Sequence, residues 1–206
     1  MKAFDKKYFK NGIELIAGVD EAGRGPLAGP VVAAAVIFDK NFYLEGVNDS
    51  KQVAESQREN LYNQIITQAL SYSISIIEVD VIDKINILNA SLLAMKQAVH
   101  KLSIKPNLVL IDGNRKYQSE DAVVPIVKGD AKSFSIAAAS ILAKVTRDRL
   151  MKNLAKDYPE YFWEQNKGYP TKKHREIIKQ IGPSPLHRKS FMKKIITEEQ
   201  ILTIKF

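Results

Sequence analysis

The sequence contains no cysteine, only three histidines and no long hydrophobic run. The absence of cysteine excludes disulfides, thiol nucleophiles and thiolate metal sites, and it is typical of proteins in a reducing cytoplasm. The longest apolar stretch, Val31 to Phe38, has eight residues, whereas a membrane-spanning helix needs about 20. Residues 1–9 are charged and lack the apolar core of a signal peptide. We therefore expect a soluble, cytoplasmic protein without a membrane anchor.

The positive charge of the chain is concentrated near its end. The net charge of the 206 residues is +8, and residues 166–206 alone carry ten Lys or Arg against three Glu. A basic segment on a nearly neutral body is typical of a protein that binds a polyanion, most simply nucleic acid. A solvated basic surface is the alternative. With 45% hydrophobic residues the chain can bury the core of one domain with a small appendage.

Hydrophobic periodicity predicts an α/β protein. Five short apolar or alternating segments predict strands, at Leu15–Val19, Val31–Phe38, Tyr72–Val79, Leu108–Ile111 and Val123–Val127. Helical spacing predicts helices at Ser56–Leu70, Val81–Leu102, Ser133–Asp157 and Thr171–Ile181. We expect a mixed sheet in which the first three strands form a meander and the last two extend its other side. The nearly continuous apolar second strand should be buried on both faces.

The segment from Asp20 to Pro30 combines two adjacent carboxylates, an arginine and three glycines directly after the first predicted strand. Acidic pairs bind divalent metal, arginine pairs with phosphate, and glycines let a backbone approach a ligand closely. Two acids next to a buried strand cost stability unless something compensates them. Adjacent strand residues point to opposite faces. Asp20 and Glu21 can therefore share one metal only if the strand is distorted, or if Glu21 contributes its carbonyl.

Two further acids fall at comparable places. Asp112 ends the fourth predicted strand, and Asp130 follows the fifth at the start of the predicted long helix. If the first and fourth strands are parallel neighbours, these carboxylates meet at the edge where open α/β sheets bind ligands. Oxygen ligands in a chain without cysteine favour Mg²⁺ or Mn²⁺ over Zn²⁺. The alternatives are a plain Asp-Gly turn at Asp112 and an N-cap at Asp130.

Taken together, the motifs of this chain resemble those of ribonuclease HII, a member of the ribonuclease H-like superfamily. They occur in order along nearly the whole chain, as GVDEAGRGPLAGPV from Gly18, NDSK from Asn48, LIDGN from Leu110, KGDAKSFSIAAASILAKVTRD from Lys128, GYPTKKH from Gly168 and GPSPLHRKSF from Gly182. The resemblance implies a ribonuclease H-like mixed five-stranded sheet flanked by helices. It also implies a catalytic domain at 1–158, followed by a basic helical C-terminal region at 159–206 that contacts the duplex.

The resemblance further implies an endonuclease that hydrolyses the RNA strand of RNA/DNA hybrids. Such an enzyme also cuts on the 5′ side of single ribonucleotides embedded in duplex DNA, as in ribonucleotide excision, and leaves a 3′-hydroxyl and a 5′-phosphate. The catalytic and metal-binding residues would be Asp20, Glu21, Asp112 and Asp130, with two Mg²⁺ or Mn²⁺ ions during catalysis. The substrate-binding residues would be Gly23, Arg24 and Gly25 at the ribose 2′-hydroxyl, Tyr169 against the sugar, and Lys51 near the phosphates.

Other residues have structural interpretations. His100 is expected to be structural, and His174 and His187 either structural or in contact with phosphate. Asp148 is expected to pair with Lys144 or Lys152 on one helix.

The expected oligomeric state is a monomer. Residues Gln200–Phe206 loosely resemble a peptide that binds a sliding clamp, although Thr203 occupies a position that is usually apolar. A sliding clamp is therefore a candidate partner, and an ordinary amphipathic terminus is the alternative.

Three other functions fit the sequence less well. A nucleotide-binding module fits poorly, because the glycine spacing is G-x-G-x-x-x-G and no Walker lysine follows. A non-catalytic hybrid-binding protein would be weakened by carboxylates that face a polyanion. Ribonuclease HIII usually carries an extra N-terminal domain, whereas about 15 residues precede the first predicted strand here.

Overall fold

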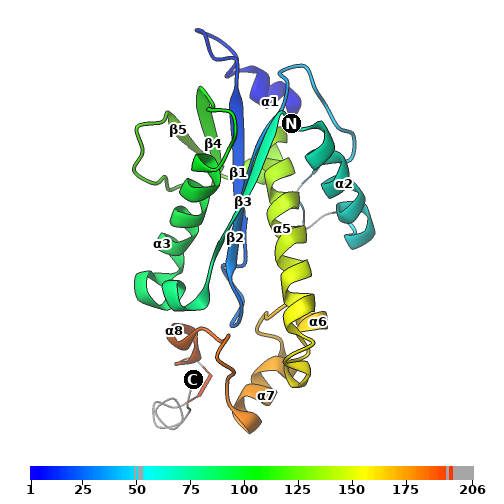
Figure 1. Ribbon diagram of the computed structural model, residues 1–206, viewed down its shortest axis with the longest axis vertical. Helices are drawn as coiled ribbons and strands as arrows, with labels where there is room; N and C mark the ends of the chain where they lie inside the picture. Colours follow the sequence, from blue (N-terminus) through cyan, green and yellow to red (C-terminus); the bar gives the residue numbers. More distant parts are fainter. Residues whose placement is uncertain (49, 51–52, 194, 197–206) are drawn as a thin grey trace.

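The centre of the molecule is a five-stranded sheet with helices on both faces (Figure 1). The computed structural model describes residues 1–48, 50, 53–193 and 195–196, so Lys51 and Gln200–Phe206 lie outside the described residues. The strands are β1 (Ile16–Ala22), β2 (Val31–Ile37), β3 (Ser71–Ile77), β4 (Leu108–Asp112) and β5 (Val123–Ile126). Their order is β3-β2-β1-β4-β5. The first three strands are antiparallel, and β4 is parallel to both β1 and β5. The predicted mixed sheet and its meander are confirmed.

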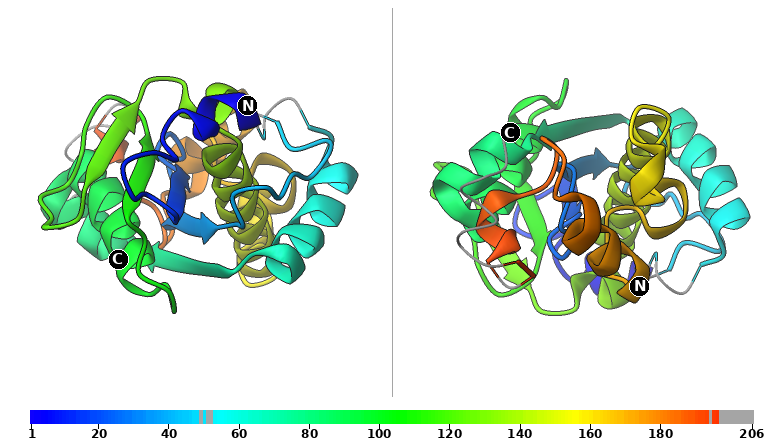
Figure 2. Two further views of the ribbon diagram at one scale, coloured as in Figure 1. Left: turned by 90° about the horizontal axis from the view of Figure 1, so that it is seen from above. Right: turned by 90° about the horizontal axis from the view of Figure 1, so that it is seen from below.

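Helices cover the two faces of the sheet, as the view from above in Figure 2 shows. They are α1 (Lys2–Lys6), α2 (Glu55–Gln68), α3 (Val79–His100), α4 (Gly129–Lys132) and α5 (Phe134–Leu154). The long helix α3 packs on one face, and α5 and α2 pack on the other. No helix in the described part of the chain is both long and apolar enough to span a membrane.

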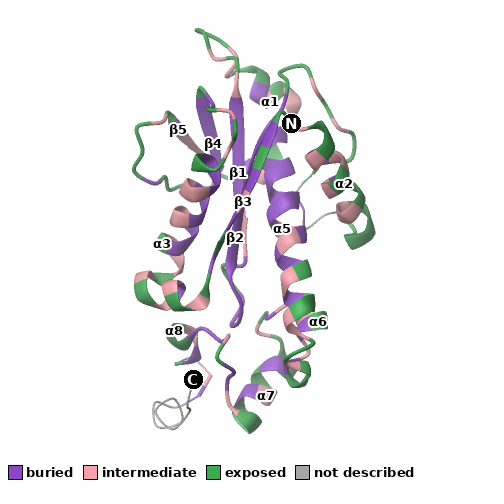
Figure 3. Cartoon of the chain, viewed as in Figure 1, coloured by how far each residue is buried: buried purple, intermediate pink, exposed green. Residues whose placement is uncertain are grey.

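Strand β2 is buried on both faces, as its apolar sequence predicts (Figure 3). Its alternate residues enter two separate clusters, because successive strand side chains point to opposite sides. Ala33 and Ala35 pack with the side chains of α3. Ala34 and Val36 pack with those of α5.

Helix α5 lies directly against β1. Its first turn is capped by Ser133, whose hydroxyl accepts a hydrogen bond from the amide of Ile136. A Cβ at Gly18 of β1 would overlap the backbone of Ser135, so only glycine allows this close approach. The contact fixes the distance between the helix and the strand that carries the acidic pair.

The predicted helical C-terminal region is present, and it packs against the loop that follows β1. Its elements are η1 (Pro159–Tyr161), α6 (Trp163–Asn166), α7 (Lys172–Ile181) and α8 (Lys189–Met192). A buried cluster joins Trp163, Ile178 and Met192 of this region to Leu27 and Ala28 of the loop. The boundary at 158/159 stays a prediction, but the region is attached to the sheet through this loop.

His174 and His187 are both buried in the C-terminal region, and their Nε2 atoms lie 3.1 Å apart. Of the two interpretations that the sequence allows, this burial supports the structural one over contact with phosphate.

Two element boundaries differ from the prediction in ways that affect the site. Strand β1 continues to Ala22, which pairs with Val32 of β2. Asp20 and Glu21 therefore lie within the strand and not after it. Asp130 is not at the start of the long helix, because Ser133 has an extended backbone that separates the four-residue helix α4 from α5.

Candidate functional site

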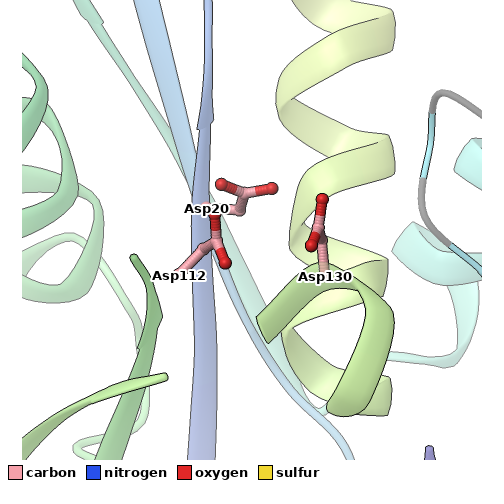
Figure 4. Close-up of side chains that lie close together, drawn as sticks. All are labelled: Asp20, Asp112 and Asp130. Atoms are coloured by element: carbon pink, nitrogen blue, oxygen red, sulfur yellow. The ribbon is translucent and has the colours of Figure 1, made fainter. Parts of the chain in front are cut away.

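Three carboxylates from three separate elements converge beside β1 where the neighbouring strand β4 ends (Figure 4). Asp20 comes from β1, Asp112 from the end of β4, and Asp130 from α4. One oxygen atom of each lies within 4.8 Å of the others. The strands β1 and β4 are parallel neighbours, and Val19 lies opposite Ile111. Asp20 and Asp112, the next residues of the two strands, are therefore side by side. The convergence expected from the strand ends is therefore observed for these three aspartates.

Within this group the pKa of Asp20 is raised. Burial is the largest cause for Asp20, whose pKa lies well above its usual value, and the charges of Glu21 and Asp112 add to it. Hydrogen bonds from Ser140 and from the backbone amide of Glu21 act in the opposite direction, and the amide lies 2.7 Å from Asp20 Oδ1. The repulsion that remains would be relieved by a cation between the oxygens.

Glu21 lies outside the group of three but faces the same pocket. Its side chain is 8% exposed, and Oε1 accepts a hydrogen bond from Arg24 Nη1 at 3.3 Å. Oε2 is buried and has no hydrogen-bond partner within the described residues. Burial raises the pKa of Glu21, Arg24 lowers it and Asp112 raises it further. A buried carboxylate oxygen without a partner is a feature that a bound metal ion would satisfy.

The carboxylates line an open pocket of about 620 Å³. Its other walls are the Gly23–Gly25 segment, Ser50, Ser140, Lys144 and Tyr169. The structure thus brings together all the predicted site residues that it describes. Lys51, the remaining one, lies outside the described residues.

Sequence analysis did not identify Ser140 and Lys144 as site residues. They are one helical turn apart on α5, on the side that faces Asp20. The Ser140 hydroxyl lies 2.9 Å from that of Ser50 and also bonds Asp20. The ammonium group of Lys144 pairs with Asp148 at 2.8 Å, which confirms the first of the two predicted partners of Asp148. Only the packing of α5 on β1 distinguishes these residues from other Ser and Lys of the helix.

Tyr169 lies at the mouth of the pocket beside Gly25. Tyr169 is 37% exposed, and a Cβ at Gly25 would lie 3.8 Å from the tyrosine ring. Lys144 Nζ is 5.7 Å from the ring centroid and the Arg147 guanidinium carbon 5.8 Å. An aromatic face beside a glycine loop can pack against a sugar or base.

Comparison with known proteins gives consistent results. A family model described as ribonuclease HII matches residues 17–194. A ribonuclease HII from Caldanaerobacter subterraneus subsp. tengcongensis is 50% identical over 196 residues, which are 95% of this chain and 81% of that protein.

Two solved structures are similar in fold. The structure of ribonuclease H2 from Pyrococcus horikoshii OT3 has a TM-score of 0.75 and 32% identity, and the match covers 92% of this chain and 100% of that one. The ribonuclease HII in a complex with PCNA from Archaeoglobus fulgidus has a TM-score of 0.70 and 25% identity, with coverage of 86% and 95%.

Proposed function

Because the chain belongs to the ribonuclease HII family, whose members are metal-dependent endoribonucleases of the ribonuclease H type, we propose that it cuts duplex DNA on the 5′ side of an embedded ribonucleotide. It would also hydrolyse the RNA strand of longer RNA/DNA hybrids. The observation that carries this proposal is a single pocket in which three convergent aspartates face the Gly-Arg-Gly loop. One nucleotide in this pocket could then contact both the metal ligands and a loop suited to its ribose.

The donor set fits a divalent cation of the Mg²⁺ or Mn²⁺ type. Asp20, Asp112 and Asp130 would hold it through carboxylate oxygens, and Glu21 would complete the set with its unpartnered Oε2. Two bound divalent ions supply Lewis-acid polarisation of the phosphodiester and neutralise the charge that develops on its oxygens. The hydrogen bond from Ser140 keeps the Asp20 carboxylate directed at the pocket.

The histidines of the chain support hydrolysis by water over attack by the 2′-hydroxyl. The latter reaction usually relies on general acid–base groups, often a pair of histidines. Here His174 and His187 are buried in the C-terminal region, and His100 is at the end of α3. None of the three lines the carboxylate pocket. Water as the nucleophile gives the proposed 5′-phosphate and 3′-hydroxyl products.

The segment Gly23–Gly25 would recognise the ribose. The amides of Arg24 and Gly25 donate to no acceptor within the described residues, and both residues line the pocket. Exposed amides can bond a 2′-hydroxyl, which DNA lacks, and this distinguishes the two sugars. Tyr169, next to Gly25, would pack against the same sugar. Lys51 near the phosphates stays a prediction from the sequence.

The C-terminal region at 159–206 would hold the backbone of the duplex through its basic side chains. Phosphate contacts of this kind give affinity without sequence preference, so the ribose and not the base selects the site. We expect the enzyme to act as a monomer.

A sliding clamp is a further candidate partner, which Gln200–Phe206 would bind. The PCNA complex of the Archaeoglobus fulgidus enzyme supports this extension of the proposal. Deletion of residues 200–206 should abolish co-elution with the clamp of the same organism and leave cleavage of a short duplex unchanged. Clamp binding by the truncated chain would contradict it.

The test is cleavage of a labelled DNA duplex that contains one ribonucleotide, with Mg²⁺ or Mn²⁺ and with a chelator. We expect a nick on the 5′ side of the ribonucleotide that needs metal and leaves a 3′-hydroxyl. A folded sample that cuts long hybrids but not this duplex would contradict the proposal, as would a product that ends in a 2′,3′-cyclic phosphate.

A further inference from the structure

Two buried guanidinium groups hold the loop between β1 and β2. Arg188, which is 0% exposed, donates six hydrogen bonds to backbone carbonyls of this loop. The acceptors are the carbonyls of Gly23, Arg24, Pro26, Gly29 and Pro30, at 2.6 to 3.3 Å. One side chain from the far end of the sequence thus bonds most of the loop that contains the Gly-Arg-Gly segment.

Arg147 of α5 joins the same loop to the segment that carries Tyr169. It is 1% exposed and donates to the carbonyls of Pro30, Ala28 and Lys167, each at 3.0 Å. The amide of Leu27 also donates to the carbonyl of Gly168 at 2.8 Å. The glycine loop and Tyr169 are therefore fixed relative to each other through Arg147.

The glycines of the loop fit this arrangement. A Cβ at Gly23 would overlap the Arg147 side chain, and one at Gly168 would lie 2.7 Å from the carbonyl oxygen of Ala28. The backbone therefore packs directly on the guanidinium groups. Glycine is required here by contact from within the protein, in addition to any contact with a ligand.

Neither arginine forms an ion pair within the described residues, and all the hydrogen bonds of both guanidinium groups go to backbone carbonyls. Asp148 and Asp83 act on Arg147 and Arg188, respectively, only through their charges. Burial of a charge without an ion-pair partner is expensive. Burial, followed by the charge of Arg147, lowers the pKa of Arg188 to about 9. Such cost is typical of sites that need a fixed geometry for function.

We propose that Arg147 and Arg188 are positioning residues for ribose recognition: they bind the carbonyl side of the Gly23–Pro30 loop and so leave the amides of Arg24 and Gly25 directed at the substrate. The inference rests on the proposed function, because it assigns the cause of ribose selectivity within that site. It extends that function to two residues that do not themselves touch the substrate.

The test measures selectivity and not activity alone. Cleavage of a duplex with one ribonucleotide gives KM, and inhibition by the same duplex with deoxyribose at that position gives Ki. The ratio Ki/KM reports recognition of the 2′-hydroxyl and does not depend on the fraction of active enzyme. In Arg188→Lys, which keeps the charge but loses the planar donor set, we expect this ratio to fall by about tenfold, the effect of one or two lost hydrogen bonds.

The matched control is Arg149→Lys, on the same helix as Arg147 but paired with Glu59 at the surface. Its ratio should stay within about twofold of the wild type. A folded Arg188→Lys variant with an unchanged ratio would overturn the inference, even if its kcat fell. If that variant does not fold, the ratio is measured in Arg147→Lys, in which all six hydrogen bonds of Arg188 remain. An unchanged ratio in a folded Arg147→Lys variant would then overturn the inference. A wild-type chain that cleaves neither the duplex nor a hybrid would instead contradict the proposed function.

Discussion

The backbone amide of Gly129, the first residue of α4, donates a 2.6 Å hydrogen bond to Oδ1 of Asp112, the last residue of β4. This bond ties the turn after β5 to the end of the neighbouring parallel strand. Asp130 follows Gly129 directly, so the bond also sets where its carboxylate lies relative to Asp112 and Asp20. One backbone contact therefore positions two of the three convergent aspartates.

Substitution of Gly129 by alanine should lower cleavage with little loss of duplex binding. The new Cβ would lie 3.2 Å from Asp112 Oδ1 and 2.6 Å from Ile136 Cδ1, so the carboxylate has to move. We expect kcat to fall by about tenfold or more and the concentration of Mg²⁺ needed for half-maximal rate to rise, because a small displacement of a ligand weakens the site. A titration of the rate with Mg²⁺ measures both effects.

The double variant Gly129→Ala/Ile136→Val separates packing from ligand displacement. Removal of Cδ1 from residue 136 relieves the closest of the contacts and leaves those with Asp112 Oδ1 and with Ile126 Cβ, which would lie 3.3 Å away. The double variant should regain thermal stability but not kcat. Full recovery of kcat would show that packing, and not Asp112, causes the loss.

Much of this fold follows from local sequence pattern. Seven residues of β3, Ser71–Ile77, alternate between buried and exposed or partly exposed positions, and β2 is apolar throughout and buried on both faces. The parallel pairing of β1 with β4 explains why acids far apart in the sequence meet. The carboxyl ends of strands therefore predicted the positions of Asp20 and Asp112 from the chain alone.

Other features depend on tertiary contacts that no local pattern encodes. The break between α4 and α5 depends on the capping by Ser133 and on the bond from Gly129 to Asp112. Ser140 and Lys144 belong to the site only because α5 packs closely on β1 at Gly18. Arg188 counts toward the basic C-terminal charge, yet it is fully buried and bonds only backbone carbonyls among the described residues. Net charge does not reveal which cations are buried.

Substitution of either of two aspartates should abolish cleavage and spare duplex binding. In Asp20→Asn and Asp130→Asn the oxygen donors to the metal are weakened, whereas the basic surfaces that hold phosphate are unchanged. We expect kcat to fall by at least about a hundredfold. The thermal stabilisation of the wild type by Mn²⁺ should also disappear in Asp20→Asn, because the ion no longer favours the folded state.

Asp121→Asn is the matched control for these variants. Asp121 lies in the β4–β5 connection and is not among the residues that line the carboxylate pocket. Its cleavage rate and its response to Mn²⁺ should match the wild type. Retained activity in Asp20→Asn or Asp130→Asn would contradict the assignment of metal ligands.

Tyr169 should act through its ring and not through its hydroxyl. Its ring lies beside Gly25 and within 6 Å of Lys144 and Arg147, at the pocket, where it can pack against a sugar. Tyr169→Ala should lower kcat/KM on the single-ribonucleotide duplex by about tenfold or more, as expected for loss of a stacking contact, and Tyr169→Phe should retain most of it. Tyr72→Ala, on the exposed side of β3, is the control. Equal losses in Tyr169→Phe and Tyr169→Ala would assign the effect to the hydroxyl.

The C-terminal region should be sensitive to acid because His187 is buried in its neutral form. Burial, followed by the charge of His174, lowers the pKa of His187 to about 3. The backbone amide of Ser184 donates to its Nδ1 at 2.9 Å. In the unfolded chain the imidazole takes up a proton near its ordinary pKa of about 6.5, whereas the folded protein resists it. The free energy of unfolding should therefore fall as the pH drops from about 6.5 toward 3.

The variant His187→Gln tests this origin of the acid sensitivity. Its free energy of unfolding should depend less steeply on pH between about pH 6 and pH 4, by up to about 1.4 kcal/mol per pH unit, because one proton no longer binds on unfolding. Denaturant titrations at each pH measure the slope, which is independent of any uniform loss of stability. The control His100→Gln removes an exposed histidine at the end of α3 and should keep more of the wild-type slope. Equal slopes in the wild type and in His187→Gln would show that His187 does not cause the acid sensitivity.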